Sequence, residues 1–337
     1  MLWNDKITCL VESTTYCNAK CPQCSRTNPN GLEFSNICEL KHVTLSEWIE
    51  GYAKSYEWIK NFHFSGQWGD CFMNPEIEDI FTHIRENSDC KFSFSTNGSL
   101  RNPDFFWRIG SENRGRISGT FDVDGWTQEN HEMYRRNTIL DKVKENVESF
   151  AYTTNHTKIF TVVFKHNQDD VKHIRKWAES IGAVYEPMQS NRFQTGTTYD
   201  YEYKGKTYTL EQTDIAEHRE KFDTSGNRIV RDHRHKKTFK DRSCIQCIWG
   251  IDNKVYVDEY LNVWPCCYWH LRSVRPGAEP MSPTYSKFVE ECNMGEYNLN
   301  KYTLNEILEK DFFRKDLLSS FDHQPEPLCK FICGNQE

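Results

Sequence analysis

The feature that most constrains the fold is a regular alternation of strand-like and helix-like segments over the first 190 residues. Helical patterns separate the strand-like segments and are long enough to carry the chain back across a sheet. Strands joined by such crossovers run parallel to one another. The sequence therefore predicts an α/β fold, a parallel sheet covered by helices and either open or curled toward a barrel. The expected strands are 7–12, 61–67, 91–96, 116–123, 158–165 and 183–189.

Four polar or cysteine-bearing segments follow the ends of these strands. They are the loop after the first strand and residues 65–70, 95–99 and 122–126. In parallel α/β folds the active site lies at the carboxyl ends of the strands. We therefore expect these segments to meet at one rim of the sheet.

The alternating pattern breaks near Asn191. Residues 199–210 alternate around Lys204-Gly205 and predict a hairpin. The stretch 228–242 holds seven Lys or Arg against two Asp, which favours a solvated linker, with a phosphate-binding patch as the alternative. From Cys244 the chain forms a cysteine-bearing module with an expected helix over 304–321. The predicted domains are 1–190, 191–243 and 244–337.

Composition sets broad limits on the class of protein. With 37% hydrophobic and 14% aromatic residues, the chain can bury a sizeable core. A net charge of −7 argues against a dedicated nucleic-acid binder. No apolar run approaches the roughly 18–20 residues that cross a bilayer, and the first residues lack a signal-peptide pattern. We expect a soluble, cytoplasmic protein.

Fourteen cysteines is a high number for such a chain. In a reducing compartment thiols stay free, and free thiols at close spacing indicate metal ligands. Most of them fall into one group near each end of the chain. The remaining cysteines are expected to be buried as small apolar side chains: Cys9, Cys38, Cys71, Cys90 and Cys292.

The first group is Cys17-x-x-x-Cys21-x-x-Cys24. Thiolate ligands favour zinc or an iron–sulfur cluster over hard cations. Structural zinc normally takes four protein ligands, whereas a loop of this kind can ligate three of the four irons of a cubane. Three ligands without an obvious fourth suggest an open coordination position.

Residues 16–24, Tyr-Cys-Asn-Ala-Lys-Cys-Pro-Gln-Cys, resemble the cluster loop of the radical S-adenosylmethionine (SAM) superfamily. The resemblance implies a partial (β/α)6 TIM-like barrel and a [4Fe–4S] cluster whose open iron binds the amino and carboxylate groups of SAM. It also implies reductive cleavage of SAM to a 5′-deoxyadenosyl radical that abstracts a substrate hydrogen atom. Gln23 departs from the pattern, because many members carry an aromatic residue there.

The same resemblance assigns SAM-binding residues to the strand ends. Residues 64–67 are similar to the motif that contacts the SAM amino group, with Gln67 in place of the acid. By the same alignment Arg135 pairs with the SAM carboxylate. Asp122 stands where relatives often carry Ser. The full predicted set is Ser65, Gly66, Gln67, Ser95, Thr96, Asn97, Asp122 and Arg135.

The second group offers six thiols for one or two sites. A zinc ribbon would be satisfied equally well by this arrangement. Beside the first motif, the segment resembles the C-terminal extensions called SPASM or twitch domains, which carry auxiliary iron–sulfur clusters. The one-cluster twitch form fits six cysteines better. The predicted ligands are Cys244, Cys266, Cys329 and Cys333, with Cys247 and Cys267 as possible substitutes.

The resulting expectation is a radical SAM oxidoreductase or modifying enzyme with two [4Fe–4S] clusters. Its expected substrate is a small polar, sugar-like or nucleotide-linked molecule, with the auxiliary cluster as electron acceptor and flavodoxin or ferredoxin as external donor. Peptide modification is one alternative. The others are a zinc-stabilised interaction protein without catalysis and an electron-transfer protein that does not bind SAM. The sequence identifies no catalytic acid or base.

Overall fold

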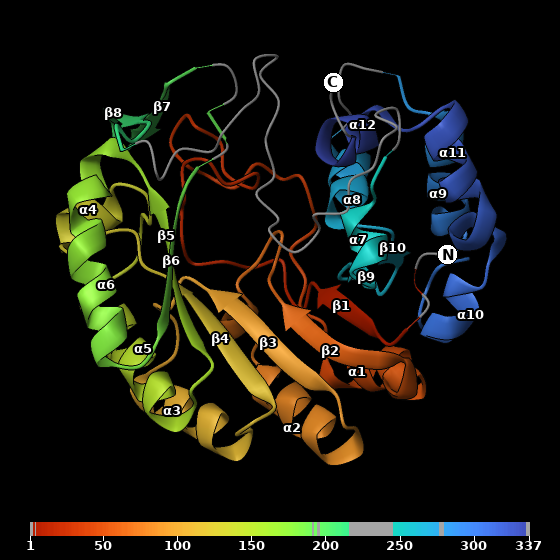
Figure 1. The fold of residues 1–337 in the computed structure, drawn as a ribbon, viewed down its shortest axis with the longest axis horizontal. Helices are drawn as coiled ribbons and strands as arrows, with labels where there is room; N and C mark the ends of the chain where they lie inside the picture. Colours follow the sequence, from red (N-terminus) through yellow and green to blue (C-terminus); the bar gives the residue numbers. More distant parts are fainter. Residues whose placement is uncertain are drawn as a thin grey trace.

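The computed structural model describes residues 3, 5–190, 192–193, 196–215, 245–275 and 280–334. Its main sheet contains six parallel strands in sequential order. Figure 1 shows these strands as a curved wall with helices along its outer side. The arrangement confirms the predicted partial barrel. The strands are β1 (Ile7–Val11), β2 (Ile59–Phe64), β3 (Lys91–Thr96), β4 (Ile117–Asp122), β5 (Thr157–Val163) and β6 (Val184–Gln189).

Helices and 3-10 segments fill the crossovers between the strands, as the alternating pattern predicts. Thr44 and Glu47 form the capping box of the first helix, each side chain accepting the backbone N–H of the other residue. Asn102 caps α3, where Pro103 occupies the first turn. The elements are α1 (Leu45–Tyr52), η1 (Ala53–Trp58), η2 (Cys71–Met73), α2 (Ile77–Asn87), α3 (Pro103–Glu112), α4 (Gln128–Glu132), α5 (Leu140–Thr153), η3 (Lys165–Asp170) and α6 (Val171–Ser180).

Strand alternation gives the sheet two different faces. The outer side chains are buried against the helices, as for Phe62, Phe94 and Phe121. The inner side chains are polar for the most part and remain half-buried, as for His63 and Ser93. Since side chains alternate along a strand, the inner face is a separate polar surface that lines the interior of the barrel.

The cysteine-bearing C-terminal region extends the same sheet. Strand β9 (Lys254–Val257) pairs in parallel with β1, and β10 (Val263–Trp264) pairs antiparallel with β9. In Figure 1 the later helices stand beside this edge of the sheet. They are α7 (Ile248–Ile251), α8 (Cys267–Val274), α9 (Pro283–Asn293), α10 (Leu304–Leu308), the π-helix η5 (Phe312–Asp316), α11 (Leu317–His323) and α12 (Pro327–Cys333).

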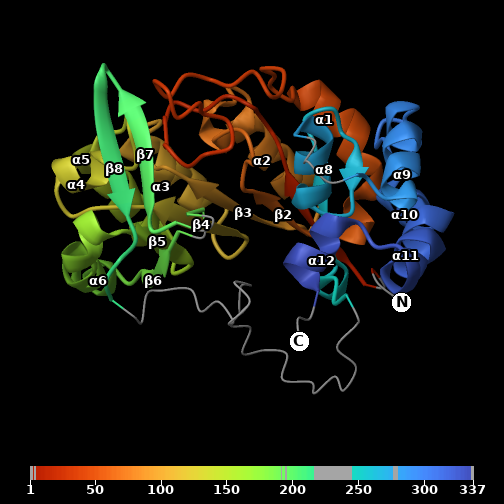
Figure 2. The same ribbon diagram turned by 90° about the horizontal axis from the view of Figure 1, so that it is seen from above.

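Two local predictions have different outcomes. The hairpin around Lys204-Gly205 is confirmed as β7 (Thr198–Tyr203) and β8 (Lys206–Glu211), which stand apart from the main sheet in Figure 2. The single helix over 304–321 is wrong. Its place is taken by α10, η5 and α11, and the π-helical η5 carries the buried side chains of Phe312 and Phe313.

The predictions on the scattered cysteines, the basic stretch and membrane-spanning segments have different outcomes. Four of the five scattered cysteines are buried, but Cys38 is only half-buried. The basic stretch 228–242 lies outside the described residues. None of the helices in the described ranges is long and apolar enough to span a bilayer.

Phe94 generates a prediction about stability. It is fully buried on β3, and its ring contacts Phe72, Phe121 and Phe150 at centroid distances of 4.9, 5.4 and 5.1 Å. Phe94→Ala is expected to lower the free energy of unfolding by about 3–5 kcal/mol, measured by urea denaturation. The matched control is Trp107→Ala, because Trp107 is 52% exposed and its loss should change stability by less than about 0.5 kcal/mol. Equal losses in the two variants would contradict this account of the core.

Candidate metal centres and cofactor site

The loop after β1 carries the first three cysteines, and all three thiols are free. Its turns are fixed by a hydrogen bond from the Cys24 N–H to the Cys21 carbonyl at 3.0 Å and by the Thr27 hydroxyl, which donates to the same carbonyl at 2.7 Å. The thiols pack against a small apolar cluster that includes Leu32 and Tyr134. The loop is therefore held in shape by its own backbone and by apolar packing.

Two polar side chains point at these sulfurs. Arg135 Nη1 lies 3.6 Å from Cys21 Sγ, and Asn97 Nδ2 lies 3.9 Å from Cys17 Sγ. Burial raises the pKa of the Cys21 thiol to about 11, with Arg135 acting in the opposite direction. Burial also raises the pKa of Cys17. Donors directed at sulfur in a partly apolar loop suit thiolates that ligate an iron–sulfur cluster.

The turn after β2 is held by a carboxylate that sequence reasoning missed. Glu12, 1% exposed, accepts the backbone N–H groups of Gln67, Trp68 and Gly69 at 2.6, 3.2 and 3.0 Å. The Tyr256 hydroxyl donates to it at 3.0 Å. Burial raises the pKa of Glu12 to about 7, although these donors lower it. The available sequence signal was an acidic residue directly after a buried strand.

Within this turn the backbone leaves no room for a side chain at Gly66. Its φ is +53°, and a Cβ would lie 1.8 Å from the carbonyl oxygen of Gly69. The side-chain oxygen of Gln67 is buried and has no hydrogen-bond partner in the described residues. A buried acceptor of this kind fits a ligand that donates a hydrogen bond, such as an ammonium group.

The predicted residues after β3 meet a second acidic residue that the sequence did not single out. Asp70 accepts hydrogen bonds from the Thr96 hydroxyl at 2.7 Å and from the backbone and side-chain amides of Asn97 at 2.9 and 2.8 Å. Thr96 and Asn97 therefore fix the loop after β2. Ser95, on the opposite side of the strand, is half-buried on the inner face.

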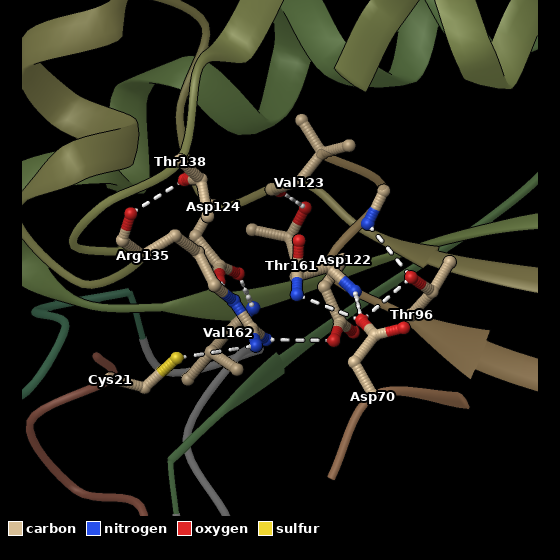
Figure 3. A network of polar contacts seen from close by, with 12 residues as sticks. Cys21, Asp70, Thr96, Asp122, Val123, Asp124, Arg135, Thr138, Thr161 and Val162 are labelled. Atoms are coloured by element: carbon tan, nitrogen blue, oxygen red, sulfur yellow. Dashed lines mark hydrogen bonds and ion pairs between the residues drawn. The ribbon is translucent and has the colours of Figure 1, made fainter. Parts of the chain in front are cut away.

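Arg135 lies between two carboxylates, as Figure 3 shows. Its Nη2 is 3.1 Å from Asp122 and its Nε is 2.5 Å from Asp124. The guanidinium that was predicted to bind the SAM carboxylate is thus already paired with two acids. Burial raises the pKa of Asp122 to about 7, partly offset by Arg135. Asp124 also accepts the Val162 N–H at 2.6 Å, so this carboxylate links the loop after β4 to β5.

Gln23, the departure from the family pattern, joins the cysteine loop to the end of β6. It is 6% exposed, and its Oε1 accepts the Ser190 hydroxyl at 2.6 Å. Its backbone carbonyl accepts a hydrogen bond from Arg192 Nη1 at 2.6 Å. The amide therefore ties the first and last strands of the barrel together at the rim.

Four cysteines of the second group come from three segments: Cys247 before α7, Cys266 before α8, and Cys329 and Cys333 on α12. An isolated bridge pairs Ile245 with Gly334, and the Gln246 N–H donates to the Cys333 carbonyl at 2.9 Å, which brings Cys247 toward Cys333. On α8, which Cys266 caps, Trp269 Nε1 lies 3.2 Å from Cys329 Sγ.

The electrostatics separate Cys247 from Cys267. Burial raises the pKa of Cys266, and the neighbouring thiols Cys267, Cys329 and Cys247 add to the effect, with Cys267 contributing most among them. Burial raises the pKa of Cys267 to about 12, and the charged neighbour of that thiol is Glu12. Cys247, Cys329 and Cys333 thus influence one another's pKa, whereas Glu12 is the charged neighbour that acts on Cys267. Cys244 lies outside the described residues.

In the described residues, no group of three or more His, Cys, Asp or Glu side chains is arranged around a position for one metal ion.

These elements define a partial (β/α)6 barrel with a three-cysteine loop at its carboxyl rim and an added cysteine-bearing region. Residues 11–178 match the family model described as the radical SAM superfamily, and the chain belongs to that superfamily. Among curated protein sequences, none matches the chain.

Solved structures support the same fold. Streptococcus suis SuiB bound to S-adenosylmethionine is 11% identical with a TM-score of 0.55, and the match covers 84% of this chain and 64% of SuiB. SuiB bound to the precursor peptide SuiA gives a TM-score of 0.58 at 10% identity, covering 93% and 67% of the two chains. Native anSMEcpe with bound AdoMet gives 0.52 at 14% identity, covering 94% and 84%. The chain thus spans a little under two thirds of the SAM-bound SuiB chain.

The Glu12 clamp generates a prediction. Glu12→Gln replaces an acceptor-only group by an amide whose NH2 would face backbone donors, so at least one buried N–H loses its partner. We expect the free energy of unfolding to fall by about 1–3 kcal/mol and the amides of residues 67–69 to exchange hydrogen faster, measured by urea denaturation and hydrogen exchange. The control is Glu50→Gln on the exposed face of α1. Unchanged exchange at residues 67–69 would show that Glu12 does not hold the turn.

Proposed function

We propose that this protein is a radical SAM enzyme in which Cys17, Cys21 and Cys24 hold a [4Fe–4S] cluster. The observation that carries the proposal is the loop itself, three free thiols at the carboxyl rim with side-chain donors directed at two of the sulfurs. When bound, a reduced cluster of this type supplies the electron that cleaves SAM to a 5′-deoxyadenosyl radical. The residues of this chain then have to bind, orient and shield the nucleoside and the substrate.

The rim residues suit that task. Gln67 offers a buried carbonyl oxygen to the SAM amino group, and Glu12 keeps the turn in place. Ser65, Gly66, Ser95 and Asn97 complete the proposed SAM contacts. Arg135, held between Asp122 and Asp124, would approach both the SAM carboxylate and Cys21. The Arg135 guanidinium already forms ion pairs with two carboxylates. Its proposed role is therefore to balance the negative charge at the cluster as well as to bind SAM.

For the second site we propose an auxiliary [4Fe–4S] cluster held by Cys247, Cys266, Cys329 and Cys333. Four thiolates would complete its ligation and leave it as an electron carrier or acceptor. This set keeps three of the ligands expected from the sequence and uses Cys247 in place of Cys244. We propose flavodoxin or ferredoxin as the external electron donor.

The proposed reaction is oxidation or modification of a small polar, sugar-like substrate. Peptide modification is the second candidate, because SuiB and anSMEcpe have been solved with peptides. Assays with both substrate classes separate the two candidates, since each requires a different molecule to gain or lose hydrogen during SAM cleavage.

The radical class is tested by SAM cleavage. Anaerobically reconstituted protein with dithionite and SAM is expected to form 5′-deoxyadenosine, detected by chromatography, and the Cys17/Cys21/Cys24→Ala triple variant is expected to form none. The control is Cys292→Ala, because Cys292 is buried away from both cysteine groups on α9. Equal deoxyadenosine in the triple variant and the wild type would contradict the proposal.

The auxiliary ligand set is tested by comparing Cys247→Ser with Cys267→Ser. Wild-type protein is expected to hold about eight irons after reconstitution, as two four-iron clusters. Cys247→Ser should lose or alter the auxiliary cluster, read by iron content and by the electron paramagnetic resonance of the reduced protein. Cys267→Ser should leave both readings unchanged. The reverse pattern would assign Cys267 to the cluster, and tightly bound zinc in place of iron would favour the zinc-ribbon alternative.

A further inference from the structure

A cavity of about 470 Å³ lies in the barrel interior, between the inner faces of β1, β2 and β3 and the helix α7. Its volume falls within the range of pockets that hold small molecules. No role assigned so far uses it. It is lined by Thr8, Leu10, Asn61, His63, Ser93, Ile248, Trp249, Asp252 and Lys254.

Strand alternation places this cavity directly next to the proposed SAM contacts. His63 and Ser65 are two residues apart on one chain, as are Ser93 and Ser95, so each pair lies on the same side of the sheet. Two residues of strand span roughly 6.6 Å. The cavity therefore begins about one such step below the rim.

The opposite wall of the cavity belongs to the second cysteine region. Ile248 and Trp249 come from α7, and Cys247 is the residue that caps this helix. The cavity thus lies between the proposed SAM contacts and a proposed ligand of the auxiliary cluster. A molecule bound there would be close to both redox sites.

The charge of the lining indicates what the cavity can bind. Its two charged residues, Asp252 and Lys254, form an ion pair at 2.8 Å. The other polar groups are neutral: the Thr8 and Ser93 hydroxyls, the Asn61 amide and the His63 imidazole. A phosphate or other anion would need a cation without a counter-charge, and the lining does not offer one among the described residues. Neutral hydroxyl groups match the lining better.

His63 is the most specific of these groups. Its Nδ1 lies 2.7 Å from Ser93 Oγ, which also accepts a hydrogen bond from Asn61 Nδ2 at 3.3 Å. If the Ser93 hydroxyl proton then points to Nδ1, the proton of the neutral ring resides on Nε2. In the described residues Nε2 has no hydrogen-bond partner, and it is not enclosed by protein atoms. The ring therefore presents an N–H to the cavity.

The ring stays neutral over the physiological pH range. Burial lowers the pKa of His63 to about 4, and the positive charges of Lys254 and Lys158 add to the effect. A neutral imidazole donates a hydrogen bond to a hydroxyl or carbonyl oxygen without requiring a charged partner.

We propose that this cavity is the substrate site and that it binds a neutral, polyhydroxylated molecule of the size of a monosaccharide or cyclitol. Asn61, His63 and Ser93 would hold its oxygens, and Leu10, Ile248 and Trp249 would cover its apolar faces. This assignment rests on the proposed radical SAM function and narrows its substrate class.

The test measures binding by the reconstituted protein in the presence of SAM, with no turnover required. The probes for isothermal titration calorimetry are myo-inositol, which is neutral and polyhydroxylated, and glucose 6-phosphate, which carries a phosphate. Wild-type protein is expected to bind myo-inositol and to bind glucose 6-phosphate at least tenfold more weakly. Stronger binding of the phosphate, or no binding of myo-inositol, would overturn the proposal.

Two variants locate the binding. Ser93→Phe fills the cavity and His63→Ala removes the N–H donor, so each should weaken myo-inositol binding at least tenfold. The matched controls are Ser118→Phe, on the same face of β4 outside the cavity lining, and His156→Ala on the surface. Both controls should bind as the wild type does. Wild-type binding in Ser93→Phe and His63→Ala would overturn the proposal.

The same samples distinguish this inference from the proposed function. SAM affinity, measured in parallel, should be unchanged in all four variants. Absence of 5′-deoxyadenosine with myo-inositol still bound at the cavity would reject the radical function alone. Formation of 5′-deoxyadenosine with no cavity-dependent binding would reject the substrate assignment alone.

Discussion

Glu12 is the group on which the rim of the barrel depends. Its carboxylate is buried at the point where β1 ends, the cysteine loop begins and β9 runs alongside. It satisfies three backbone donors of the turn after β2 and the hydroxyl of Tyr256 on β9. Without it, all four donors would be buried without an acceptor, and each would oppose the folded arrangement. One side chain thus connects the cysteine loop, the Gln67 turn and the C-terminal region.

Other carboxylates around the rim also accept backbone N–H groups. Asp70, after β2, accepts the backbone N–H of Asn97 after β3, and Asp124, after β4, accepts the N–H of Val162 on β5. Asp170, at the end of η3, accepts the N–H of Trp126 after β4 at 2.9 Å. Each carboxylate links loops from neighbouring strands, and buried charge-assisted hydrogen bonds are stronger than neutral ones. The rim is therefore pre-organised by acids below the surface, while thiols, amides and hydroxyls face the proposed ligands.

The C-terminal region joins this frame through the sheet. Because β9 continues the sheet beyond β1, the two cysteine groups share one hydrogen-bonded framework. Trp68 beside the Gln67 turn also meets His270 of α8 edge to face, with ring centroids 6.0 Å apart. A fixed separation between the two cysteine groups would suit the proposed electron acceptor, and the polar inner face of the barrel lies beside α7 of the C-terminal region.

The sequence by itself determined the class of fold, the succession of strands along the chain and the segments that meet at the rim. These follow from local hydrophobic periodicity and from turn residues, which act over a few positions. The single helix expected over 304–321 was wrong, since α10 ends at Leu308 and the π-helical η5, with Phe312 and Phe313 buried, precedes α11. The family resemblance named Gln67 and Arg135, but it carried no information on their partners within this chain.

Only the tertiary structure decided which residues distant in sequence meet. The roles of Glu12 and Asp70 depend on backbone donors from loops 27 to 57 positions away, and no local pattern records such pairing. The proximity of Cys247 to Cys333 follows from a bridge between residues 245 and 334. The cavity beside His63 likewise exists because α7 packs across an inner face that the sequence shows only as alternating polar residues. Long-range contacts of this kind form only when the chain closes into its tertiary fold, so local sequence patterns do not determine them.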